Sequence, residues 1–241
     1  MLKLMRNKKV TKMVLWGTLI LILPAFVIWG TGSMGKSKDK GPSYAGVIDN
    51  RKVSFDDFAE SITAARCQVF LNLFNQPTAL EALLKNNEFL GRLGWDMLMM
   101  SHEAKKRKIK VSDKEVIDFI RSHPLFNRNG KFDDRIYEYV LRNNLGVYPR
   151  DFEEIVRDIL VIYKLNSIIT KDVAISDEEV LTQYKNDNKD FNEEKFNKEK
   201  GDYSKRVLDG KKNKFMEEWL RKLESNTKVL IDFKDYAKYY N

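Results

Sequence analysis

Apolar side chains recur at helical spacing through most of the chain after residue 55. Stripes of large apolar residues return every three or four positions in the longest stretches, which are residues 58–73, 89–108, 149–170 and 203–223. Shorter stretches with the same period cover residues 112–122, 133–143 and 176–184. The pattern therefore predicts a mainly α-helical fold, in which helices bury their apolar faces against one another.

In two other regions, apolar and polar residues alternate as they do in β-strands. Near the N-terminus, residues 45–48 and 52–55 flank Asp49-Asn50, a pair of residues that favours a tight hairpin turn. Near the C-terminus, residues 228–233 alternate in a similar way. Because a single strand is not stable alone, we predict that the C-terminal strand joins the N-terminal hairpin in a small β-sheet, with the helices inserted between them.

Residues 13–30 form one long apolar segment without a charged side chain. As an α-helix this segment would be ~27 Å long, which is enough to cross the hydrocarbon core of a bilayer. Residues 1–12 contain five Lys or Arg and no acid, so we expect a cytoplasmic N-terminal tail, one transmembrane anchor and a C-terminal domain beyond the membrane. The alternative is a cleaved signal peptide, since small residues follow at Gly30, Gly32 and Ser33.

The net charge of +8 is concentrated near this segment. Residues 1–12 contribute +5 and residues 36–40 a further +2, which leaves +1 for residues 41–241. The basic surplus therefore indicates membrane topology, and we expect no nucleic-acid partner. The single cysteine, Cys67, excludes an internal disulfide, and this cysteine with two histidines lacks the spacing of a metal site.

Residues 30–37, GTGSMGKS, match the nucleotide-binding pattern G-x-x-x-x-G-K-[ST]. This pattern holds a phosphate only where it connects a buried strand to the N-terminus of a helix. Here it follows the apolar segment and precedes residues 38–42, KDKGP, which cannot open a helix. We interpret residues 31–43 as a linker and expect no cofactor.

Several motifs occur together and in a fixed order along the chain. They are AGVIDNRKVSFDDF (45–58), AKKRKIKVSDKEV (104–116), FNRNGKFD (126–133), FEEIVRDIL (152–160) and ISDEEVLTQYK (175–185). In order and spacing this set resembles the SurA N-terminal domain over about residues 44–185, and more loosely over residues 203–233. The basic N-terminus and the apolar segment resemble the membrane-anchored, PpiD-like type of this family.

The resemblance implies a fold and a location. It implies a helical chaperone domain at residues 44–233 with a short tail at 234–241, anchored in the bacterial inner membrane and facing the periplasm. Members of the family commonly carry a parvulin prolyl-isomerase domain after the segment that matches residues 175–185. Here a charged stretch, residues 185–202, follows instead, as a solvated helix or a flexible link. We therefore expect no isomerase activity.

The role that the resemblance implies is ATP-independent binding of unfolded or newly translocated polypeptides. The alternative is a membrane-tethered helical scaffold protein that binds one fixed envelope partner and no unfolded clients. An enzyme is the least favoured class, because acidic pairs such as Glu153-Glu154 fall on exposed helix faces and no catalytic triad motif is present in the sequence. Besides clients and the lipids around residues 13–30, the secretion channel and a separate prolyl isomerase are candidate partners.

We expect clients to contact apolar side chains of helix 89–108 and of the turn that follows residue 125. The candidate client-binding residues are Trp95, Met99, Phe126 and Phe132. A helix that is apolar on more than one side either lines a binding surface or lies at the centre of a bundle. Burial in the core is thus the alternative interpretation of these residues.

Overall fold

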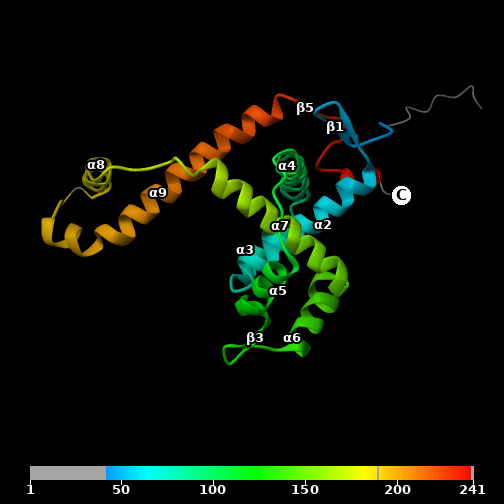
Figure 1. Cartoon of the computed structure of the whole chain (residues 1–241), viewed down its shortest axis with the longest axis horizontal. Coiled ribbons are helices and arrows are strands. Elements are labelled where there is room, and N and C mark those ends of the chain that lie inside the picture. Colours follow the sequence, from blue (N-terminus) through cyan, green and yellow to red (C-terminus); the bar gives the residue numbers. More distant parts are fainter. Residues whose placement is uncertain (1–41, 189, 240–241) are drawn as a thin grey trace, which may run out of the picture. The chain divides into compact units, whose positions relative to one another are not determined.

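The computed structural model describes residues 42–188 and 190–239, and the fold is mainly helical with small antiparallel sheets (Figure 1). Strands β1 (Gly46–Ile48), β2 (Arg51–Val53) and β5 (Thr227–Val229) form one sheet in the order β2-β1-β5. Gly46 lies opposite Val229 across the β1–β5 pair. The predicted pairing of the N-terminal hairpin with a C-terminal strand is therefore confirmed.

Most of the described α-helices begin after a residue whose side chain caps the first turn, and two begin with a proline instead. The described helices are α2 (Phe55–Leu73), α3 (Pro77–Leu84), α4 (Asn87–Lys106), α5 (Asp113–Ser122), α6 (Asp134–Tyr139), α7 (Pro149–Ile169), α8 (Asp177–Asp187) and α9 (Glu193–Glu224). Ser54, Ser112 and Ser176 each form a capping box with the acidic residue three positions later. Each box satisfies two backbone N–H groups that the first helical turn leaves unpaired.

The largest core lies among α2, α4, α5 and α7. It buries fourteen hydrophobic residues, among them Phe126, Leu141 and Phe152. The second hairpin, β3 (Asn127–Arg128) and β4 (Lys131–Phe132), covers its edge, and Asn129 and Gly130 turn it with positive φ angles. A π-helical turn, η3 (Val140–Leu145), follows α6 and ends at Gly146, whose φ is +67°.

A second core joins the two ends of the described chain. The ring of Phe58 contacts the rings of Trp95, Phe233 and Tyr236 at centroid distances of 6.2, 5.9 and 6.2 Å. Tyr236 is buried, so packed structure continues beyond the predicted domain boundary at residue 233. Gly46 permits this packing, because a Cβ there would lie 2.4 Å from the Trp95 ring and from the Lys228 carbonyl oxygen.

Helices α8 and α9 form a hairpin with a small core of its own. Val180, Tyr184, Phe196 and Tyr203 are buried there, and the Tyr184 ring lies 4.9 Å from the rings of both Phe196 and Tyr203. The described part of 185–202 accordingly includes the end of α8 and the start of α9. In Figure 1, α8 lies beside the first half of α9, and β5 follows the other end of that helix.

Within residues 42–188 and 190–239, no helix combines the length and the apolar composition needed to cross a bilayer. The predicted cytoplasmic tail (1–12), anchor (13–30) and nucleotide-type motif (30–37) lie outside the described residues.

Candidate polypeptide-binding groove

Three of the four candidate client-binding residues lie inside the fold. Trp95 and Met99 are 3% and 2% exposed in the core that joins the chain ends, and Phe126 is fully buried. The Phe126 ring packs edge-on against Tyr137 at 5.2 Å and Phe152 at 5.7 Å. Phe132 packs on the edge of the main core with the Arg121 guanidinium 6.0 Å from its ring. Trp95, Met99 and Phe126 thus have almost no surface to offer a client in this conformation.

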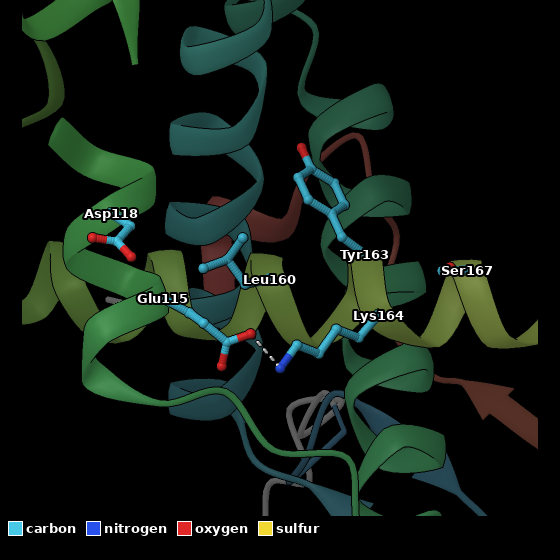
Figure 2. A pocket seen from close by; sticks show the side chains of 6 residues that line it. All are labelled: Glu115, Asp118, Leu160, Tyr163, Lys164 and Ser167. Atoms are coloured by element: carbon cyan, nitrogen blue, oxygen red, sulfur yellow. Dashed lines mark ion pairs between the residues drawn. The ribbon is translucent and has the colours of Figure 1, made fainter. Parts of the chain in front are cut away.

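The described surface has a hollow between α5 and α7 instead. It has a volume of about 370 Å³ and is lined by Glu115, Asp118, Leu160, Tyr163, Lys164 and Ser167. The four α7 residues fall on one helix face, since they follow the helical pattern i, i+3, i+4, i+7. Figure 2 shows Leu160 and Tyr163 projecting to one side of α7, and the Glu115–Lys164 ion pair bridging α5 and α7.

The charged rim of this hollow is held in place by local bonds. Lys164 Nζ lies 2.6 Å from Glu115 Oε1 and donates a hydrogen bond to the Lys110 carbonyl oxygen at 2.8 Å. The other carboxylate oxygen of Glu115 accepts the capping bond from the Ser112 backbone N–H at 2.9 Å. The hydrogen bond from Lys164, followed by those from Ser112, lowers the pKa of Glu115 to about 2. Glu115 takes part in both the cap of α5 and the ion pair with Lys164. Formation of α5 therefore also fixes the positions of these two charged side chains at the rim of the hollow.

Tyr163 supplies much of the apolar surface in this hollow. Its side chain is 39% exposed, and a hydrogen bond connects it with Asn72 of α2. Burial raises the pKa of its hydroxyl, so the ring is neutral at physiological pH. The ring can therefore cover an apolar group of a ligand while its polar end stays bonded.

A second hollow continues from the first along α7. Its volume is about 710 Å³, and it lies between the end of α7 and the middle of α9. The lining residues are Asn166, Ser167, Thr170, Lys171, Asp209, Lys212 and Asn213. Ser167 lines both hollows, so they adjoin at this residue. Ile168 on α7 and Phe215 on α9, both among the exposed large hydrophobic residues, lie next to lining residues in sequence or one turn away.

We refer to the two adjoining hollows as the α7 groove. Its α5 end has an apolar wall, and its α9 end is polar. The sequence pattern does not reveal the groove, because α7 has the pattern of an ordinary amphipathic helix and residues 209–213, DGKKN, include no large apolar side chain. Tyr163, Ile168 and Phe215 are large apolar residues that the structure leaves exposed. In the sequence they have the same helical spacing as core residues, so the pattern alone does not mark them as surface.

The lining of the groove contains neither histidine nor cysteine among the described residues. Among the described residues, no group of three His, Cys, Asp or Glu side chains could hold a metal ion. Cys67 is buried away from the groove, and burial raises the pKa of its thiol to about 12, which keeps it un-ionised.

The chain is similar in sequence to two curated proteins, both named periplasmic chaperone PpiD. The periplasmic chaperone PpiD of Escherichia coli (strain K12) is 26% identical over 164 residues, which cover 66% of this chain and 26% of that protein. PpiD of Haemophilus influenzae (strain ATCC 51907 / DSM 11121 / KW20 / Rd) is 28% identical over 146 residues, which cover 57% of this chain and 22% of that protein. The match thus spans about a quarter of the length of these relatives.

No solved structure matches the fold. The family described as the SurA-like N-terminal domain matches residues 1–166, which is more than half of the chain and includes most of α7. The α9 side of the groove lies beyond the matched region. The chain belongs to the SurA-like N-terminal domain family.

Proposed function

We propose that the protein is a membrane-anchored, ATP-independent periplasmic chaperone that holds unfolded or newly translocated polypeptides. The observation that carries the proposal is the α7 groove, an open, partly apolar surface in a member of the SurA-like N-terminal domain family. The similarity to two proteins named periplasmic chaperone PpiD supports both the role and the compartment.

The physical character of the groove suits weak and reversible binding. Covering one aromatic or aliphatic client side chain against Leu160 and Tyr163 contributes ~1.5–3 kcal/mol. A few such contacts, after the cost of ordering the segment, give a Kd on the order of 10⁻⁶ M. Weak binding allows release by exchange, so no nucleotide is required.

The proposed anchor, residues 13–30, would keep the groove close to the membrane from which translocated chains emerge. Tethering raises the effective concentration of groove and client without adding a contact. The secretion channel and a separate prolyl isomerase are the proposed neighbours in this arrangement. We propose no isomerase activity for the chain itself, because residues 185–202 are occupied by the α8–α9 hairpin.

The test is aggregation of an unfolded outer-membrane protein, followed by light scattering, with the full chain in lipid nanodiscs and without nucleotide. We expect suppression at near-stoichiometric amounts, and a severalfold loss of it in Tyr163→Ser. Tyr148→Ser is the matched control, because Tyr148 is 77% exposed in the turn before α7 and lines neither hollow.

An equal loss of aggregation suppression in Tyr163→Ser and Tyr148→Ser would show that the chaperone activity does not depend on the groove. A folded protein that leaves aggregation unchanged would contradict the chaperone proposal. A pull-down from membranes that then yields one defined envelope protein would favour the scaffold alternative.

A further inference from the structure

We propose that the α9 end of the α7 groove is a carboxylate-binding pocket, in which Lys171 and Lys212 bind an acidic side chain or the C-terminal carboxylate of a client. This inference rests on the proposed function and adds to it the chemistry of the segment that the groove selects. It concerns residues 170–213, which lie beyond the region matched by the family.

The two lysines approach the hollow from different elements and lack ionic partners. Lys171 follows the end of α7, and Lys212 lies in the middle of α9. Neither has an ion pair or a side-chain hydrogen bond within residues 42–188 and 190–239. The adjacent Lys211 differs, since its Nζ lies 2.7 Å from Glu179 of α8. Lys171 and Lys212 are thus available to an anionic ligand.

The other lining groups fit a carboxylate. Asn166, Asn213 and Ser167 carry N–H or O–H groups that can donate to its oxygens. Asp209 also lines the hollow, so two positive charges face one negative charge, and the hollow keeps a surplus of one positive charge.

The end of α7 would ordinarily oppose an anion, because its free carbonyl groups carry partial negative charge. Here two carbonyl groups near the end of α7 have donors. The Asn166 carbonyl oxygen accepts from the backbone N–H of Thr170 and from its hydroxyl, both within 2.9 Å, and the Ile168 carbonyl oxygen accepts from the Lys171 N–H. These bonds reduce the opposing field.

The opposite end of the groove shows the contrast. Its lysine and its two carboxylates are already paired, Lys164 with Glu115 at 2.6 Å and Asp118 with Lys114 at 2.6 Å. The α5 end therefore presents mainly Leu160 and Tyr163 to a ligand, whereas the α9 end presents unpaired positive charge. A bound segment must therefore place an apolar side chain at the α5 end and an anionic group at the α9 end.

The spacing of the two ends predicts the sequence of that segment. Tyr163 and Lys171 are eight residues apart, which is ~12 Å along a helix axis. An extended chain covers ~12 Å in about four residues, and side chains four positions apart point to the same face. The favoured client carries an aromatic residue followed, or preceded, at four positions by a carboxylate.

The experiment measures fluorescence anisotropy of labelled seven-residue peptides with the full chain in nanodiscs. One peptide is blocked at both ends and has phenylalanine and aspartate four positions apart, and its counterpart has asparagine in place of aspartate. A third peptide replaces the aspartate by a free C-terminal carboxylate at the same spacing, and a fourth moves the aspartate by one position. We expect about fivefold tighter binding with a carboxylate at the correct spacing.

The double variant Lys171→Gln/Lys212→Gln should abolish this preference. Lys205→Gln/Lys214→Gln is the matched control, since it removes the same charge from exposed positions of α9 outside both hollows. A preference for the aspartate peptide or for the free-carboxylate peptide identifies which source of carboxylate is bound.

Two results would overturn the inference. Equal affinity for the asparagine peptide and for both carboxylate peptides, or a preference that survives in the Lys171→Gln/Lys212→Gln variant, would remove the carboxylate pocket and leave the proposed function standing. Failure of the native protein to bind any of the peptides would count against both.

Discussion

The core that joins the chain ends and the core of the α8–α9 hairpin are both built around aromatic clusters, yet they depend on different contacts. Phe58 meets Phe233 and Tyr236 across about 175 positions of sequence. Tyr184 meets Phe196 and Tyr203 within twenty positions. The first cluster needs the whole domain to be folded, whereas the second needs only two neighbouring helices. We therefore expect the hairpin to open locally while the rest of the domain stays folded.

The largest effect on stability is expected from a substitution in the aromatic cluster that joins the chain ends. Phe58→Ala removes a fully buried ring that contacts Trp95, Phe233 and Tyr236. We expect a loss of ~3–5 kcal/mol in the free energy of unfolding, measured by urea denaturation. Phe215→Ala, at an exposed position of α9, should change it by less than ~1 kcal/mol. Similar losses in the two variants would show that the end-joining core does not hold the domain together.

An intermediate and local effect is expected from Tyr184→Ala in the hairpin. The substitution removes a buried ring and the hydrogen bond from its hydroxyl to Glu199 at 3.0 Å. We expect the amides of α8 and of the first half of α9 to exchange hydrogen at least tenfold faster, which is ~1.4 kcal/mol or more of local stability. Amides of α2 and α4 should keep their native rates. Faster exchange throughout the domain would show that the two cores unfold together.

The smallest effect on stability is expected from a carboxyl group between α4 and α9. Burial, and then the charge of Glu224, raises the pKa of Asp96 to about 6 from its ordinary value of 3.8. The folded state therefore binds this proton more tightly than the unfolded state, and stability should rise as the pH falls from about 7 to about 5. Asp96→Asn should flatten this dependence and add ~1 kcal/mol at pH 7.5. Thermal unfolding across this pH range measures both, and an unchanged slope would exclude Asp96 as its source.

Much of the framework followed from local pattern. The Asp49-Asn50 turn and the three serine caps are short-range signals, and the sheet was inferred because an isolated strand had to find a partner. The hairpin core was missed, because Phe196 and Tyr203 stand among charged residues whose number hides their common face. The pattern at Trp95 and Met99 allows both core and surface, and the packing of α4 against α2, the N-terminal hairpin and the C-terminal segment places them inside.

The groove could not be predicted in the same way. It combines residues 160–171 with residues 115–118 and 209–213, and which helices lie side by side is a property of tertiary structure. Lys212 follows Lys211 in the sequence, and Lys171 precedes Asp172. Within the described residues, Lys211 is paired with Glu179 whereas Lys171 and Lys212 have no ion pair, and this difference is visible only in the structure.

The pairing of β1 with β5 also sets the order in which the protein itself can fold. A chain is made and delivered from its N-terminus, so β1 and the Phe58 surface exist well before residues 227–236 arrive to cover them. Contacts at such separation form late, because the loop between them must close first. During that interval the nascent protein exposes an unpaired strand edge and uncovered aromatic rings. Until its C-terminal segment arrives, the protein is therefore itself an incompletely folded polypeptide, like the clients that we propose it binds.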